Sequence, residues 1–233
     1  MKLADPPMPE TSGRRRRKDA RPSEIAAAAL AVFAEKGFAA ARLEDVAARA
    51  GVAKGTVYLY FSTKEALFEA VVRDAFRPLL DGVGRARMDT STSCADQLRG
   101  VLTIVYRELV ATERRQIMRL LIAEAERFPD LVSFYHREIV SRGRGLLAAI
   151  LADGVARGEF RDGPAVRQPE VVIGPAIMAA VWKLVFEPVE PLDLDRYAAA
   201  HLDLVMAGLS AREEAPPQVR GSARHAPRSR RAT

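Results

Sequence analysis

The chain has 233 residues, of which 48% are hydrophobic and 28% are charged, and its formal net charge is +6. This length suffices for one large or two small domains with a packed core. The single cysteine, Cys94, excludes an internal disulfide and a four-cysteine zinc site, and is typical of a reducing compartment.

Neither a secretory signal nor a membrane span is predicted. The charges within residues 1–20 neither follow nor precede an apolar run. The most apolar window, 171–186, has sixteen residues and contains Lys183, whereas a helix that crosses a bilayer needs about 20 apolar residues. We therefore expect a cytoplasmic protein that does not enter the membrane.

The positive charge is concentrated at the two ends of the chain. Residues 1–20 carry six Lys/Arg against three Asp/Glu, and residues 211–233 carry six against two, which leaves −1 for residues 21–210. Both end segments are rich in Pro, Ser and Arg, so we expect them to be disordered. The basic run 14–18 is either a solvated tail or an arm that adds nonspecific affinity for nucleic acid.

Between these ends, apolar residues recur at helical spacing and no convincing strand is predicted. Residues 23–36 form the first such segment, with Ser23 as its cap and Gly37 as its end. Residues 43–50 form a second, shorter helix with acidic residues in its first turn, where they favour a helix start.

The stretch 47–61, AARAGVAKGTVYLYF, has the spacing of a helix-turn-helix motif. Small Ala47 is placed where the two helices touch, Gly51 lies in the turn, and Val57 anchors the second helix. That helix would present its first residues to the major groove of DNA. The expected contacts with base edges and backbone come from Lys54, Gly55 and Thr56.

Two tyrosines are left on the outer side of this helix when Val57 and Phe61 point into the core. Phenol hydroxyls can donate hydrogen bonds to phosphates, so Tyr58 and Tyr60 are expected to flank the DNA. In the alternative interpretation, the two rings cover the joint with the next helix.

The remaining pattern is also helical. Residues 63–80 predict a helix that Pro78 ends or bends and that links two domains. Further helices are predicted at 94–111, 113–126, 130–157, 168–186 and 195–210. The expected fold is therefore all-α with about nine helices, divided into a helix-turn-helix domain at 21–66 and a second helical domain at 67–210.

The run 22–76, above all GFAAARLEDVAARAGVAKGTVYLYFSTKEALFEAVV, strongly resembles the amino-terminal DNA-binding domain of the tetracycline-repressor (TetR) family. The resemblance implies a homodimeric regulator whose third helix, near residues 53–61, reads a palindromic double-stranded operator. It assigns Lys54, Gly55 and Thr56 to bases, Tyr58 and Tyr60 to phosphates or the groove, and Lys64 to a phosphate clamp.

Two residues depart from the family pattern. Ala41 stands where the family often has a capping threonine, and Ala53 stands where it often has serine. Loss of such a cap costs roughly 0.5–2 kcal/mol, and each lost hydroxyl also removes a candidate phosphate contact. Arg42 is expected to restore one such contact.

The second domain resembles the family more loosely. Residues 118–138 resemble the subgroup named for the regulator AefR, and the family scheme implies that residues 67–210 bind a small effector and form the dimer. The expected lining of the effector site is aromatic or thioether: Tyr106, Met118, Phe134, Met178 and Trp182. The expected dimer residues on the last two helices are Val172, Ile173, Met178, Leu202, Val205 and Leu209. For each of these residues, ordinary internal packing is the alternative.

An enzyme is the competing class of protein. The histidines His136, His201 and His225 are far apart in sequence and lack the short spacing of a metal motif. The sequence shows neither a Gly-rich phosphate loop nor a nucleophile elbow, so we expect no catalytic residues, no metal and no cofactor. The function that the sequence favours is a repressor released from its operator by a small apolar effector. Activation is compatible with the same sequence, because the position of the operator decides between them.

Overall fold

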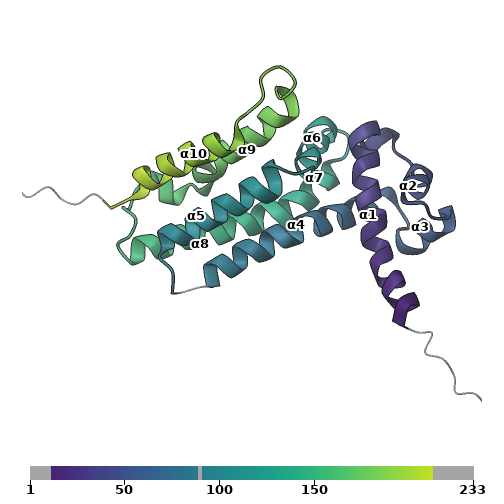
Figure 1. The fold of residues 1–233 in the computed structure, drawn as a ribbon, viewed down its shortest axis with the longest axis horizontal. Coiled ribbons are helices and arrows are strands. Elements are labelled where there is room, and N and C mark those ends of the chain that lie inside the picture. Colours follow the sequence, from purple (N-terminus) through teal and green to yellow (C-terminus); the bar gives the residue numbers. More distant parts are fainter. Residues whose placement is uncertain (1–11, 89–90, 212–233) are drawn as a thin grey trace, which may run out of the picture.

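The computed structural model describes residues 12–88 and 91–211, and this part of the chain is helical (Figure 1). The α-helices are α1 (Ser12–Ala40), α2 (Leu43–Ala50), α3 (Lys54–Tyr60), α4 (Lys64–Met88), α5 (Cys94–Val105), α6 (Arg115–Glu124), α7 (Pro129–Tyr135), α8 (Ser141–Ala156), α9 (Pro169–Val185) and α10 (Leu194–Leu209). A π-helical turn, Tyr106–Val110, extends α5, and a second one, His136–Val140, joins α7 to α8. The all-α prediction is confirmed.

Two helices are longer than predicted. The first, α1, begins at Ser12, so part of the expected disordered arm is helical; arginine and lysine are good helix formers, and the helix continues through Pro22. The other, α4, passes Pro78 and ends at Met88, because Leu79 and Val83 continue its buried stripe beyond the proline. Residues 1–11 and 212–233 of the expected arm and tail lie outside the described residues.

The helices form two groups along the long axis of the molecule (Figure 1). Helices α1 to α3 make one end, and α4 runs from this end into a bundle with α5 and α8, with α9 and α10 paired along one side. The short helices α6 and α7 lie where the bundle meets α1. No helix in the described ranges combines the length and apolarity that crossing a membrane requires.

The small amino-terminal unit does not have a separate core. Its rings Phe33 and Phe38 lie with Phe68 of α4 at centroid distances of 5.4–6.3 Å, and all three side chains are buried. Phe38 also makes an edge contact with Phe128, just before α7, at a centroid distance of 4.8 Å. Because one apolar cluster crosses the boundary, movement of one unit alters packing in the other.

A buried polar chain fixes α10 against two other helices. The Tyr106 hydroxyl lies 2.9 Å from His201 Nδ1, and His201 Nε2 lies 3.0 Å from the carbonyl oxygen of Val172. A carbonyl can only accept, so Nε2 carries the proton and Nδ1 accepts from the tyrosine. Burial lowers the pKa of His201, although the bond to the Val172 carbonyl opposes this shift.

We expect the protein to lose stability in mild acid because of His201. In the unfolded chain this imidazole takes up a proton near pH 6.5, whereas the folded state resists protonation. The free energy of unfolding is therefore fully present above pH 6.5 and falls below it, by up to about 1.4 kcal/mol per pH unit. Urea unfolding between pH 7.5 and pH 5.5 measures this fall.

His201→Gln should be less stable at pH 7.5 and show a weaker dependence on pH, while the control His136→Gln removes an exposed imidazole and keeps the wild-type profile. Equal slopes for all three proteins would contradict the assignment.

Candidate DNA-contacting helix and ligand cavity

The turn between α2 and α3 has the geometry that the sequence predicted. Gly51 adopts a left-handed conformation, with φ 65° and ψ 34°, which glycine reaches without steric cost. The amide of Val52 then bonds to the carbonyl of Ala47 at 3.0 Å, which closes the end of α2. Helix α2 also has a cap that the sequence reading missed, because the Asp45 carboxylate accepts from the Arg42 amide at 3.1 Å.

Helix α3 separates buried from exposed side chains. Val57 and Phe61 are buried in the core, as predicted. Lys54 and Gly55 are exposed, Thr56 is half-buried, and Tyr58 is 43% exposed. Tyr60 is half-buried and packs against the core, so the two tyrosines differ in environment. Ala53, at the N-cap of α3, supplies no side-chain hydrogen bond.

Sequence reasoning missed Leu59. This side chain lies in the middle of α3 and is 74% exposed, although leucine is ordinarily buried. Apolar side chains on a groove-entering helix can contact the methyl group of thymine, which polar residues cannot do as well. Helical spacing was the available signal, because Leu59 comes two residues after Val57 and so lies on the opposite side of α3 from the core.

Lys64 is held by backbone carbonyls. Its ammonium group donates to the carbonyl oxygens of Phe38 at 2.6 Å and Ala39 at 3.0 Å, and lies 4.6 Å from the centroid of the Phe38 ring. It therefore ties the start of α4 to the end of α1. Its expected contact with a phosphate stays a prediction.

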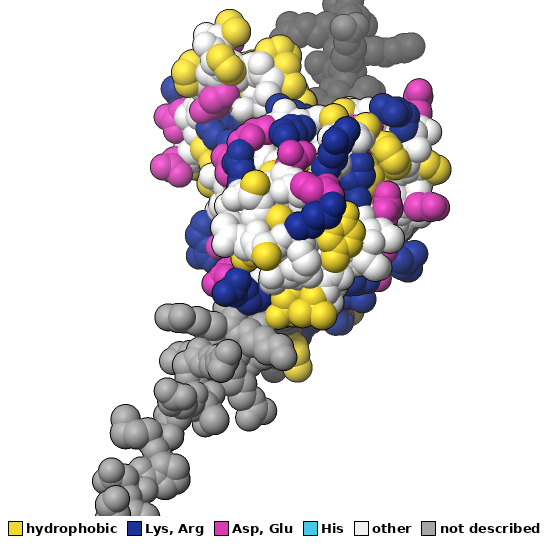
Figure 2. Space-filling view, turned by 90° about the vertical axis from the view of Figure 1, so that its right-hand side faces the viewer, with side chains coloured by type: hydrophobic (Ala, Val, Ile, Leu, Met, Phe, Trp, Pro, Cys, Tyr) yellow, Lys and Arg dark blue, Asp and Glu magenta, His cyan; other side chains and the backbone are white. Residues whose placement is uncertain are grey.

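The face that carries α2 and α3 mixes both signs of charge (Figure 2). Residues 21–66 contain six Lys/Arg and five Asp/Glu, a net charge of +1. Three ion pairs join these groups: Lys36 with Asp45 at 2.7 Å, Arg49 with Glu35 at 2.5 Å and Lys54 with Glu44 at 2.5 Å. A polyanion that binds this face must therefore displace these carboxylates from their lysine and arginine partners.

A second contact between the two units lies at Gly37, where α1 is interrupted with φ 76°. On α6, Glu124 accepts from the Ala39 amide at 3.1 Å, and the Arg119 guanidinium donates to the Ala34 carbonyl. These two bonds hold α1 on both sides of Gly37. We call this pair of contacts the α6 clamp.

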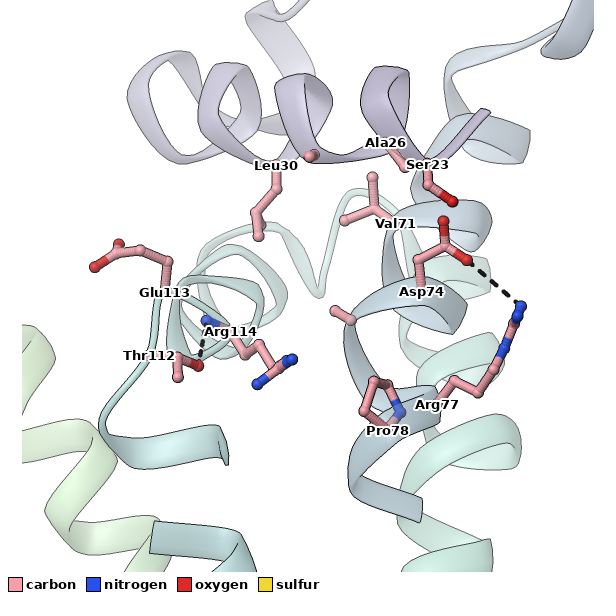
Figure 3. Close-up of a pocket in the computed structure, with 12 residues that line it drawn as sticks. Ser23, Ala26, Leu30, Val71, Asp74, Arg77, Pro78, Thr112, Glu113 and Arg114 are labelled. Carbon is pink, nitrogen blue, oxygen red and sulfur yellow. Dashed lines mark hydrogen bonds and ion pairs between the residues drawn. The ribbon is translucent and has the colours of Figure 1, made fainter. Parts of the chain in front are cut away.

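An open cleft lies beside the clamp, between α1, α4 and the segment before α6 (Figure 3). Its volume is about 530 Å³. Leu30 on α1 faces Val71 and Pro78 on α4, and Arg114 projects between them. The two units are therefore in contact through α4 and α6 but are not close-packed along this whole boundary.

The bundle encloses an apolar cavity of about 520 Å³, within the usual range for small-molecule sites. It lies between α4, α5, α6, α8 and α9 and extends to the π-helical turns. Its lining is mainly aliphatic: Phe76, Leu79, Leu80, Val83, Val101, Val105, Leu109, Met118, Tyr135, Ile139, Val140, Gly143, Arg144, Pro169, Glu170, Ile173, Gly174 and Ile177.

Of the five predicted lining residues, the structure places only Met118 at this cavity. Tyr106 and Phe134 are buried elsewhere, the former against His201 and the latter under the Arg73 guanidinium. Met178 is 45% exposed, and Trp182 Nε1 donates to the Glu190 carbonyl at 2.8 Å. Residue type alone does not select the lining, because the facing of each helix decides which side chains reach the cavity.

Known proteins share this pattern of helices and sequence. Residues 25–71 match the family described as "Bacterial regulatory proteins, tetR family", and residues 88–204 match "Tetracyclin repressor-like, C-terminal domain". The HTH-type transcriptional repressor KstR2 of Mycolicibacterium smegmatis is 30% identical over 193 residues, which cover 82% of this chain and 91% of that protein. The chain belongs to the TetR family. It is a DNA-binding transcriptional regulator with a helix-turn-helix domain followed by a helical domain.

Other TetR-family proteins resemble it over most of their length. The fatty acid metabolism regulator protein of Bacillus subtilis is 25% identical over 186 residues, covering 80% of this chain and 94% of that protein. The crystal structure of FadR from Bacillus subtilis in complex with stearoyl-CoA has the same fold, with a TM-score of 0.68 and 23% identity over 80% of this chain and 98% of that one.

In this TetR-family regulator, Glu44 of α2 binds two side chains of α3 that are expected to contact DNA, Lys54 and Tyr58. Besides its pair with Lys54, it accepts from the Tyr58 hydroxyl at 3.3 Å. The hydrogen bond from Lys54 lowers the pKa of Glu44, and Glu44 in turn raises the pKa of Lys54. Both groups therefore stay charged at neutral pH, and a phosphate competes directly with a carboxylate.

We expect Glu44→Gln to tighten DNA binding several-fold, because it removes this competitor and one negative charge from the DNA-facing side. Fluorescence anisotropy with a genomic fragment selected by the purified protein, at 50 and 200 mM salt, measures the change. The control Glu69→Gln makes the same charge change at a surface pair on α4 and should alter affinity much less. Equal effects of the two variants would contradict a local exchange at Lys54.

Proposed function

We propose that this chain is a cytoplasmic homodimeric repressor, released from a palindromic operator by a small, largely apolar effector that binds in the bundle cavity. One observation carries the proposal: α6 lines the cavity with Met118 and, one residue further on, holds α1 with Arg119. A ligand that displaces Met118 thus acts on the helix that positions the DNA-binding unit. The relatives named as KstR2 repressors support repression.

The proposed DNA contacts combine the expected residues with Leu59. Lys54, Gly55 and Thr56 face the bases from the first turn of α3, and Leu59, which is 74% exposed, does so from the next turn. Tyr58 contacts phosphate, and Arg42 does so from the start of α2. Tyr60 and Lys64 act mainly by positioning α3 and α4, since both are engaged with the protein itself.

The proposed dimer surface is an apolar stripe on α9. Val171, Met178 and Val185 recur every seven residues and are all exposed, and Phe186 continues the stripe. Leu204 on α10 is 68% exposed. Of the residues expected at this interface, Val172 and Leu209 are buried within the protomer, so they do not contribute. Helices α9 and α10 of two copies would form a four-helix contact.

The effector class follows from the lining and from the relatives. The cavity is mainly aliphatic, which suits a hydrocarbon chain or a steroid. FadR of Bacillus subtilis was crystallised with stearoyl-CoA, and KstR2 of Mycobacterium tuberculosis is described as a ketosteroid transcriptional regulator. The likeness of residues 118–138 to the AefR subgroup stays a prediction, and it does not narrow the ligand.

Filling the cavity should abolish effector binding without unfolding the protein. Gly143 lines the cavity, and a Cβ added there would meet no atom within 4 Å, so Gly143→Leu occupies the ligand space and also removes a helix-destabilising glycine. Wild type should bind dodecanoyl-CoA or cholest-4-en-3-one and lose operator affinity roughly 5- to 150-fold, the range of a typical coupling energy.

Calorimetry gives the ligand affinity, and anisotropy gives the operator affinity with and without ligand. The control Gly100→Leu makes the same change on α5 at a glycine that does not line the cavity and where an added Cβ meets no atom within 4 Å, so it should respond to ligand like wild type. If Gly143→Leu binds and releases as wild type does, the effector does not use this cavity and the proposed site is wrong.

The α6 clamp should be required for release rather than for ligand binding. Glu124→Ala removes the acceptor of the Ala39 amide, so the ratio of operator affinities without and with ligand should fall toward one while ligand affinity stays within about twofold. The control Glu126→Ala removes an exposed neighbour on the following turn. A normal ratio in Glu124→Ala would show that release does not depend on the Glu124 contact of the clamp.

A further inference from the structure

The cavity has one charged pair at its wall. Arg144 lies in the first turns of α8, Glu170 in the first turn of α9, and Arg144 Nε is 2.7 Å from Glu170 Oε1. They are the only charged side chains that line the cavity in the part of the chain that the structure describes. Their side chains are 59% and 55% exposed, so the pair marks the side on which the cavity opens to water.

The surface on the α4 side of the cavity is rich in arginine. Two smaller hollows adjoin the cavity there, since both share Leu80 with it and one also shares Ile139. Their arginines are Arg73, Arg77, Arg87 and Arg142. Each of these is paired on the surface with a carboxylate, but two of the contacts are long: Arg77 with Asp74 at 3.4 Å and Arg87 with Asp153 at 3.8 Å. Exposed pairs of this kind exchange partners at little cost.

An apolar ligand with a charged end can fit this arrangement in only one orientation. Its hydrocarbon part fills the aliphatic cavity, and its charged end stays at the mouth, because an unpaired charge among aliphatic side chains is very costly. The planar guanidinium of Arg144 offers two parallel donors, which match the oxygens of a carboxylate or a phosphate. An anion is therefore the charged end that Arg144 can bind.

Glu170 can give up its pair with Arg144 without becoming isolated. It lies in the first turn of α9, where the positive end of the helix dipole favours a carboxylate. An incoming carboxylate or phosphate thus takes the place of the Glu170 carboxylate on the Arg144 guanidinium. Until an anion takes its place, Glu170 holds the Arg144 guanidinium at the mouth of the cavity and accepts its hydrogen bond.

We infer that the effector is an amphiphile, with a hydrocarbon body in the cavity and an anionic head on Arg144 in place of Glu170. This inference rests on the proposed function and specifies the ligand of the same cavity. The head is a carboxylate or a phosphate, since both have the required geometry, and the arginines of the adjoining hollows extend the site for a larger phosphate-bearing head.

The test compares three ligands with one chain length: 1-dodecanol, dodecanoate and dodecanoyl-CoA. Binding to each is measured by calorimetry for wild type, Arg144→Gln and Glu170→Gln. Arg144→Gln should weaken both anions about tenfold or more, as expected for loss of a charge-assisted hydrogen bond. Glu170→Gln should strengthen both several-fold, and neither change should alter the affinity for dodecanol.

The control Arg157→Gln removes the same charge at the end of α8, away from the cavity and its two adjoining hollows, and should leave all three affinities unchanged. A loss of affinity for dodecanoyl-CoA alone in Arg144→Gln identifies phosphate as the head that Arg144 binds. A loss for dodecanoate as well shows that Arg144 also binds a carboxylate.

Two failures are distinguishable. If dodecanol and the anions bind alike and neither variant matters, the cavity takes neutral ligands and the inference is wrong while the proposed function stands. If no ligand binds, or if binding survives Gly143→Leu, the proposed site itself is wrong.

Discussion

The hold of α6 on the end of α1 is the constraint on which the rest of the structure depends. A helix-turn-helix reads DNA only if its second helix is held at a fixed distance and angle from the copy in the partner protomer. Here the unit is attached at two points, through the start of α4 with Lys64 and through the α6 clamp. Two attachments on different helices fix an orientation, and a relative shift of those helices changes it.

The conformation of Gly37 allows α6 to bind two backbone groups of α1, one on each side of a sharp turn. With φ 76°, the backbone turns sharply between the Ala34 carbonyl and the Ala39 amide, the two groups that α6 binds. A side chain at Gly37 would be strained by that φ value, and its Cβ would also lie 3.3 Å from the Glu124 carboxylate. The glycine therefore serves both the turn and the close approach of α6.

The amino-terminal unit could be predicted because its determinants are local. Gly51, Val57 and the caps act within a few residues, and each has a conformational meaning that does not depend on distant contacts. The cavity and the interface could not be predicted in the same way. Helix α9 is apolar on nearly every side, so its sequence does not say that Ile173 faces the cavity, Val172 the core and Met178 the solvent. Only the packing of four other helices decides this.

The two ligand-facing sites share one electrostatic design. At the DNA end Glu44 occupies Lys54, and at the cavity mouth Glu170 occupies Arg144. In each case an anion from outside would exchange with a carboxylate, so the number of charge contacts is the same before and after binding. Binding is then weaker than it would be at an unpaired cation, because a carboxylate must first be displaced, and the groups beside the exchanged pair add discrimination: the shape of α3 for DNA, and the apolar wall of the cavity for the effector.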